Sequence, residues 1–270
     1  MSSLSNRIKT LLPESFHPAV REIRDRIDGF PEFLSATFHP WRRDTMRRLE
    51  SLENIHQGER CFIIGNGPSL KNTDLSRLKN EFTIGMNRIY LLFPQMGFPT
   101  SYYLSVNDLV VEQCAEDIKK LGIPKFLSWH SRRWISPADN LYYLYTTYTS
   151  PKFAAHLAHR LWEGATVTYV AMQLAFFLGF KTVILIGVDH SFVTQGKPNT
   201  TVTSQGDDPN HFDPGYFGKG FRWQLPDLET SEIAYQMARQ EYQKHGRQIY
   251  DATIDGKLRI FPRLEYNLLF

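Results

Sequence analysis

Residues 60–70 of the chain read Arg60-Cys61-Phe62-Ile63-Ile64-Gly65-Asn66-Gly67-Pro68-Ser69-Leu70. The short apolar run at 61–64 is typical of a buried strand in a parallel sheet, and a glycine turn follows it directly. In open α/β sheets such a turn lies at the carboxyl edge, where ligands bind. The stretch therefore predicts the first strand and the ligand-binding turn of a Rossmann-like α/β domain that holds a nucleotide.

The chain beyond this turn alternates short apolar runs with helical stretches, which is the pattern of buried strands joined by crossover helices. We expect strands at 61–64, 82–86, 102–105, 125–127, 141–145, 182–186 and 248–251, and helices at 110–121, 167–178 and 229–245. The predicted fold class is α/β, a Rossmann-like and mostly parallel sheet flanked by helices.

Two segments depart from this alternation. Residues 1–58 combine arginine, glutamate and aromatic residues with prolines, which predicts a helical N-terminal appendage to a Rossmann-like nucleotide-binding catalytic domain at 59–270. Residues 192–226 are dense in Gly, Pro, Asp, Asn and Thr without periodicity. Such a segment predicts a long C-terminal lid loop.

The composition bears on partners and location. A net charge of +3 over 270 residues gives no concentrated basic excess, so we expect no nucleic-acid partner. The two cysteines form neither a disulfide framework nor a zinc pattern, which fits a reducing cytoplasm. No apolar run has the length of a signal peptide or a membrane span. We expect a cytoplasmic protein, soluble or peripheral; an oligomer is compatible with the sequence.

One basic cluster stands out, formed by Arg42, Arg43, Arg47 and Arg48. The favoured interpretation is a solvated helix face. The alternative is peripheral contact with an acidic partner or with the anionic inner face of the membrane.

The turn after the first strand offers several groups to a ligand. Gly65 and Gly67 allow close backbone approach, Asn66 offers an amide, and Ser69, after Pro68, can cap the next turn or contact phosphate. The turn lacks the Walker lysine and the G-x-G-x-x-G spacing, which disfavours a P-loop NTPase or an ordinary dehydrogenase. A mere tight turn is the alternative.

Other predicted strands also end in polar residues. Asn87 and Asn107 each close a strand, and Gly187 with Asp189 closes another. Carboxyl ends of parallel strands meet at one edge, so these groups predict a shared site for a ribose, base or phosphate. The alternative for each asparagine taken alone is a turn former. The alternative for Asp189 is an N-cap or an anchor of the following loop.

His211 lies within the predicted lid, among aromatic, glycine and charged residues. A loop histidine can act as a general base, and Tyr216, Lys219 and Arg222 could bind or neutralise a leaving phosphate. The alternative is that His211 is polar surface.

These motifs resemble the bacterial CMP-sialic acid sialyltransferases of the Campylobacter type. The resemblance is carried by residues 63–70, 83–87, 103–107, 164–181 and 184–189. It implies a CMP pocket and a histidine base in a lid, which His211 matches by chain order. The implied nucleotide-binding residues are Gly65, Asn66, Gly67, Pro68, Ser69, Asn87, Asn107, Thr166, Gly187 and Asp189. Around Thr166 the family's arginine and serine are absent, which leaves the sugar and the acceptor open.

The region from Arg60 to Arg263 also resembles the 6-hydroxymethylpterin diphosphokinase MptE-like domain family, which includes flagellin glycosylation accessory proteins. The two resemblances imply different reactions. The first is transfer of an acidic sugar from a CMP-activated donor to a glycan or other hydroxyl acceptor, with no required cofactor. The second is magnesium-dependent pyrophosphoryl transfer to a pterin alcohol, for which Asp108, Asp189 and Asp213 are the candidate Mg²⁺ ligands. A non-catalytic module of a surface-polysaccharide biosynthesis pathway is the third hypothesis.

Overall fold

The computed structural model describes residues 27, 29–149, 151–193 and 196–270. Its centre is a seven-stranded sheet in the order β11-β8-β1-β2-β3-β4-β5, in which every neighbouring pair is parallel. The strands are β1 (Arg60–Ile64), β2 (Phe82–Met86), β3 (Tyr102–Ser105), β4 (Lys125–Ser128), β5 (Leu141–Leu144), β8 (Thr182–Ile186) and β11 (Gln248–Asp251). All seven expected strands are confirmed, and with them the Rossmann-like α/β fold class.

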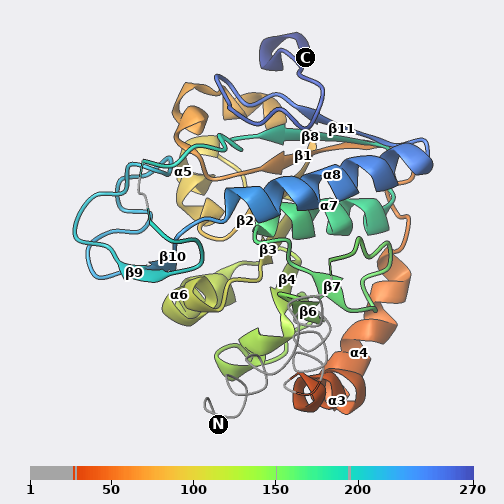
Figure 1. Ribbon diagram of the computed structural model, residues 1–270. Coiled ribbons are helices and arrows are strands. Elements are labelled where there is room, and N and C mark those ends of the chain that lie inside the picture. Colours follow the sequence, from red (N-terminus) through yellow and green to blue (C-terminus); the bar gives the residue numbers. More distant parts are fainter. Residues whose placement is uncertain (1–26, 28, 150, 194–195) are drawn as a thin grey trace, which may run out of the picture.

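Helices cover both faces of the sheet (Figure 1). The three long helices are α6 (Asp108–Lys120), α7 (Val167–Leu178) and α8 (Leu228–Lys244), each within two residues of its expected range. In β1, Cys61 and Ile63 pack in one core cluster with α7 and α8, whereas Phe62 and Ile64 pack in a second cluster with α6. Because side chains alternate along a strand, the continuous apolar run of β1 fills both cores.

Shorter elements complete the fold. They are α3 (Phe30–Phe38), α4 (Pro40–Leu49), α5 (Phe93–Met96), β6 (Thr146–Thr147), β7 (Leu161–Trp162), β9 (Thr201–Thr203), β10 (Arg222–Gln224), and the 3-10 helices η2 (Glu50–Leu52), η3 (Pro68–Asn72), η4 (Leu75–Leu78), η5 (Ile89–Leu92), η6 (Trp129–Arg133) and η7 (Tyr266–Leu268). Apart from α3 and α4, these elements have two to five residues and carry too little periodicity to be identified from sequence.

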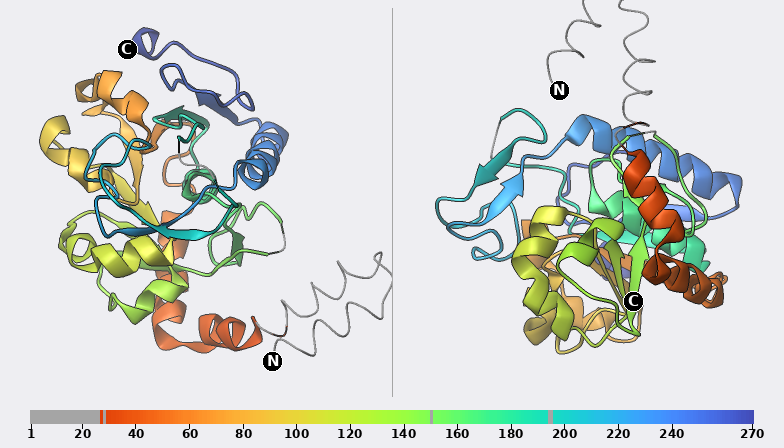
Figure 2. Two further views of the ribbon diagram at one scale, coloured as in Figure 1. Left: turned by 60° about the vertical axis from the view of Figure 1, so that its left-hand side comes forward. Right: turned by 90° about the horizontal axis from the view of Figure 1, so that it is seen from below.

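Helices α3 and α4 form the described part of the expected N-terminal appendage; residues 1–26 and 28 lie outside the described residues. Both helices lie at the end of the molecule opposite β11 (Figures 1 and 2). Helix α4 is joined to β5, since the Arg48 guanidinium donates to the Leu141 carbonyl at 2.7 Å and the Tyr143 amide donates to Thr45 Oγ1 at 3.3 Å.

The arginine cluster is not a single basic face. Arg42 is buried and donates to the carbonyls of Leu157 and Ala158, and burial lowers its pKa to about 10. Arg48 is half-buried against β5, and Arg47 pairs with Asp44 at 2.6 Å. Membrane contact through all four arginines is therefore wrong, because helix α4 turns Arg42 and Arg48 toward the protein.

The segment expected to be a lid loop contains structure of its own. Strands β9 and β10 pair antiparallel, with Thr203 opposite Arg222. Phe212, Tyr216 and Phe217 are buried in the same core cluster as Phe62 of β1. The segment is therefore packed onto the domain and carries a hairpin. Among the described residues, no helix has the length and apolar character needed to cross a membrane.

Candidate functional site

The strand order reverses between β1 and β8, since the chain runs outward from β1 to β5 and then returns to place β8 on the other side. Such a reversal opens a crevice at the carboxyl ends of the two strands. A cavity of about 180 Å³ lies there. Of the predicted site residues, Gly65, Asn66, Gly67, Asn87, Thr166, Gly187, Asp189 and His211 line it.

The glycine turn lets the ends of β1 and β8 approach each other closely. The amide of Gly65 donates to the Ile186 carbonyl at 2.8 Å, and that of Gly67 donates to the Gly187 carbonyl at 2.9 Å. A Cβ atom at Gly65 would lie 2.2 Å from the Gly187 carbonyl oxygen. Both amides are used in hydrogen bonds within the protein. The glycines therefore shape the cavity and do not offer both of their N–H groups to a phosphate.

Asp189 anchors the turn from the other strand. The amide and hydroxyl of Ser69 donate to its two carboxylate oxygens at 3.0 and 2.7 Å. Burial raises the pKa of Asp189, and the Ser69 hydrogen bonds oppose that effect. Ser69 and Pro68 are absent from the cavity lining among the described residues. Ser69 has a structural role here, and ligand contact by these two residues stays a prediction.

Two asparagine side chains face the cavity in different states. Asn87, at φ 52°, accepts from the Ser105 hydroxyl at 3.0 Å through its Oδ1 atom. Asn66 has a buried Oδ1 atom to which no group of the described residues donates. An unpaired buried acceptor is costly, so Asn66 is prepared for a donor group of a ligand.

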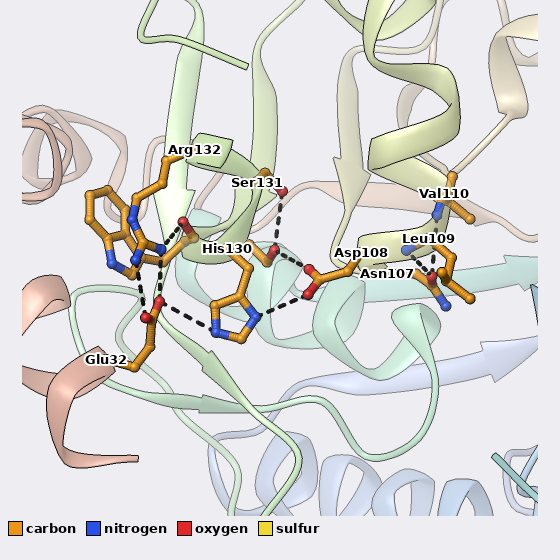
Figure 3. Close-up of polar contacts among 10 residues, drawn as sticks. Glu32, Asn107, Asp108, Leu109, Val110, His130, Ser131 and Arg132 are labelled. Atoms are coloured by element: carbon orange, nitrogen blue, oxygen red, sulfur yellow. Dashed lines mark hydrogen bonds and ion pairs between the residues drawn. The ribbon is translucent and has the colours of Figure 1, made fainter. Parts of the chain in front are cut away.

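Within the described residues, Asn107 and Asp108 do not belong to the cavity lining. Figure 3 shows the contacts that they make instead. The Oδ1 atom of Asn107 accepts from the amides of Leu109 and Val110, and so caps the N-terminus of α6. The carboxylate of Asp108 contacts His130 Nδ1 at 3.3 Å, and the other ring nitrogen of His130 lies 3.4 Å from Glu32 of α3. In this structure Asn107 caps a helix, and its contact with a nucleotide stays a prediction.

His211 is held by a buried carboxylate. Its Nδ1 atom lies 2.7 Å from Asp208 Oδ2, and its ring stacks on Tyr216 with centroids 4.1 Å apart. Asp208 also accepts from the amides of Asn210 and Phe217. When Asp208 accepts a hydrogen bond from Nδ1, the Nε2 atom of the neutral ring keeps its lone pair. This is the arrangement of a general base with an orienting group.

The other three predicted catalytic residues do not line the cavity. Tyr216 is fully buried beneath His211, and its hydroxyl accepts from the Arg88 amide at 3.2 Å. Arg222 lies on β10 and pairs with Glu112 at 2.8 Å, and Lys219 is exposed near the hairpin. Tyr216 therefore supports the histidine ring, and contact of these three residues with a leaving phosphate stays a prediction.

Sequence reasoning missed several lining residues. His190 and Ser191 follow Asp189 directly, while Asp227, Ser231 and Tyr235 come from the start of α8. His190 could have been found from its sequence position, because it follows Asp189 at a strand end that was already predicted to belong to the site. The contribution of α8 had no local signal, because it depends on how the helix packs beside α7.

Thr166 is the N-cap of α7, and its hydroxyl accepts from the Thr168 amide at 3.3 Å. Thr166, Val167 and Thr168 all line the cavity, so the N-terminus of a 12-residue helix faces it. The partial positive charge of such a terminus attracts anions.

The three candidate magnesium ligands do not converge. Asp189 is engaged by Ser69, Asp108 by His130, and Asp213 accepts from the Gly215 amide at 2.7 Å. Within the described part of the chain, no group of three or more His, Cys, Asp or Glu residues is arranged to hold a metal ion. The carboxylates present thus do not form an all-protein Mg²⁺ site.

The fold is similar to that of the MAf glycosyltransferase from Magnetospirillum magneticum AMB-1, with a TM-score of 0.50 and 15% identity over 84% of this chain and 38% of that one. This chain thus spans well under half of that protein. A mammalian sialyltransferase gives a TM-score of 0.33 at 14% identity, over 80% of this chain and 79% of that chain, which is too low to support an inference. No curated protein matches the chain.

A family model described as 6-hydroxymethylpterin diphosphokinase MptE-like matches residues 42–195. The match includes the glycine turn, Asn87, α7 and the end of β8, and it stops before His211. Because it covers more than half of the 270 residues, the chain belongs to the 6-hydroxymethylpterin diphosphokinase MptE-like family.

Proposed function

We propose that the protein is a glycosyltransferase that moves an acidic sugar from a CMP-activated donor to a hydroxyl group of a glycan. The observation that carries the proposal is the pairing of His211 with Asp208, at 2.7 Å, beside a cavity at the switch point of the sheet. A base oriented in this way can take the proton of an acceptor hydroxyl as it attacks the donor.

The remaining lining supports a nucleotide donor. The unpaired Oδ1 atom of Asn66 can accept from the amino group of a base or from a ribose hydroxyl. The N-terminus of α7 offers a site for the phosphate. Closing this cavity with the segment that carries His211 would exclude water from the reacting groups.

The first test is nucleotide binding. We expect CMP to bind saturably by calorimetry in the presence of EDTA, and a thermal-shift series with CMP, CDP, UDP, GDP and ATP to favour CMP. Failure of the wild-type protein to bind CMP under any condition would refute the proposed donor.

The second test is turnover. With CMP-N-acetylneuraminic acid as the donor, His211→Ala should lower CMP release about 10²- to 10⁴-fold while CMP affinity changes little. The matched control is His245→Ala, an exposed histidine near Glu241 at the end of α8. Unchanged CMP release in His211→Ala would remove His211 as the base.

Pyrophosphoryl transfer from ATP to a pterin alcohol is the second candidate, favoured by membership of the 6-hydroxymethylpterin diphosphokinase MptE-like family. It predicts tight ATP binding that requires magnesium. Since the protein carboxylates do not converge, the ion would be held largely by the phosphates themselves. Magnesium-dependent ATP binding without CMP binding would select this reaction over sugar transfer.

A further inference from the structure

Groups that can become positively charged are scarce around the cavity. Its described lining includes the carboxylates of Asp189 and Asp227 but no lysine or arginine. The side chains in this lining that can become cations near neutral pH are His190 and His211. A bound phosphate would therefore depend on these two rings and on the N-terminus of α7 for positive partners.

His190 is constrained by its backbone conformation and by a carboxylate. It lies four residues after the end of β8 and adopts φ 54°, a left-handed conformation that residues other than glycine rarely take. Such conformations persist where the surrounding structure enforces them, often at functional sites. The Nε2 atom lies 2.8 Å from Glu232 Oε1 of α8, and the side chain is only 8% exposed.

The two histidines contact their carboxylates through different ring nitrogens. Asp208 accepts from Nδ1 of His211, which leaves Nε2 of that ring for chemistry. Glu232 accepts from Nε2 of His190, which leaves Nδ1. Besides Glu232, the titratable groups around His190 include Tyr235 of α8, with ring centroids 6.1 Å apart, the adjacent Asp189, and Asp227 and His211 in the same cavity lining.

We propose that His190 is a second catalytic residue, the general acid opposite His211, an inference that rests on the proposed glycosyl transfer. The bond between the sugar carbon and the phosphate oxygen breaks, its electron pair stays on that oxygen, and the oxygen takes the proton from Nδ1 of His190. The acceptor oxygen forms the new bond to the same carbon and gives its proton to Nε2 of His211. One histidine thus ends neutral and the other ends protonated.

The binding experiment compares CMP with cytidine, which lacks the phosphate. We expect His190→Gln to weaken CMP binding about 10- to 100-fold at pH 6, the loss of a hydrogen bond to a charged group, and to leave cytidine binding unchanged. The matched control His245→Gln should change neither affinity. Equal weakening of CMP and cytidine by His190→Gln would show a structural role and overturn the inference.

The kinetic experiment follows CMP release from CMP-N-acetylneuraminic acid against pH. Wild-type kcat should fall on both sides of an optimum, because one histidine must be neutral and the other protonated. His190→Gln should lower kcat about 10²- to 10⁴-fold and abolish the decline on the alkaline side. Retention of wild-type kcat and of the alkaline decline would overturn the inference.

Different results would refute the proposed function and the role of His190. If the wild-type protein neither binds CMP nor releases it from the donor, the proposed function itself is wrong. If the wild type does both, and His190→Gln matches it in CMP affinity and pH profile, the proposed function stands and the role of His190 is wrong.

Discussion

Asp208 and Glu232 act on the cavity through histidine rings that they contact directly. Asp208 is buried and accepts three hydrogen bonds from its own segment, while Glu232 is half-exposed on α8. The more buried partner fixes its ring more rigidly, because its carboxylate is itself held by backbone amides. At the scale of single residues, the cavity therefore has one firmly oriented histidine and one held more loosely.

Gly67→Ala is expected to destabilise the protein. A Cβ atom there would lie 1.8 Å from Asp189 Oδ2, which the Ser69 hydrogen bonds hold in place. Overpacking of this kind typically costs about 1–3 kcal/mol. Urea unfolding would measure the loss, with Gly122→Ala as the control because nothing lies within 4 Å of a Cβ at Gly122. Equal stability of the two variants would contradict this account of the turn.

At the scale of elements, the segment with β9 and β10 is joined to the domain at three places. Phe212 donates its amide to the Asn66 carbonyl, the Arg88 guanidinium donates to the carbonyls of Gly215 and Tyr216, and Gln113 of α6 bonds the amide and carbonyl of Arg222. The position of His211 thus depends on β1, β2 and α6 together.

Arg88→Ala should loosen this segment and leave the fold intact. We expect faster amide hydrogen exchange across residues 204–222, little change in CMP affinity and a lower rate of CMP release, since the segment carries the proposed base. Arg43→Ala serves as the control, an exposed arginine on α4. If exchange in 204–222 stayed at the wild-type rate, Arg88 would not anchor the segment.

The regular elements could be predicted from the sequence because each carries its own periodicity. Strands such as β8 and helices such as α7 are mostly apolar and are followed directly by a glycine. The corner formed by Gly65, Gly67 and Asp189 was found because it lies at strand ends of a parallel sheet. Its details were not predictable: whether Asn107 faces a ligand or caps α6 depends on side-chain packing.

The conformation of the lid was harder to predict, because it also depends on side-chain packing. Its residues lack periodicity, so the sequence predicted a loop in which Tyr216 was free to meet a phosphate. Burial of Tyr216, Phe212 and Phe217 in the core cluster of the sheet is a long-range effect that no local pattern encodes. His211 was identified by residue type and context, whereas Asp208 and His190 were found only from the structure.

At the scale of the whole molecule, stability should fall as pH rises from about 5 to 8. Burial raises the pKa of Glu163 from 4.5 to about 8. The pKa of His130 is also raised, because the His130 ring contacts the Asp108 carboxylate. A raised pKa in the folded state means that the fold holds protons which the unfolded chain releases. This stabilisation is complete below the unfolded pKa and is lost as pH rises through the folded pKa.

Glu163→Gln tests this dependence. The amide cannot ionise, so the variant should gain stability over the wild type between pH 5 and pH 8, by up to about 4 kcal/mol. Urea unfolding at both pH values would measure the difference, with exposed Glu50→Gln as the control. A gap between variant and wild type that stays constant with pH would show that Glu163 ionises normally.

Several of the hydrogen bonds that attach the β9–β10 segment to the domain use main-chain atoms of the segment. Phe212, Gly215 and Arg222 are all held through main-chain atoms, as is Tyr216 by the Arg88 guanidinium. Main-chain bonds of this kind place no requirement on side chains, whereas the buried rings of Phe212, Tyr216 and Phe217 do. The exposed positions of the segment are therefore free to diverge during evolution while its attachment to the domain stays the same. A lineage could change the surface around His211 in this way without disturbing the corner formed by Gly65, Gly67 and Asp189.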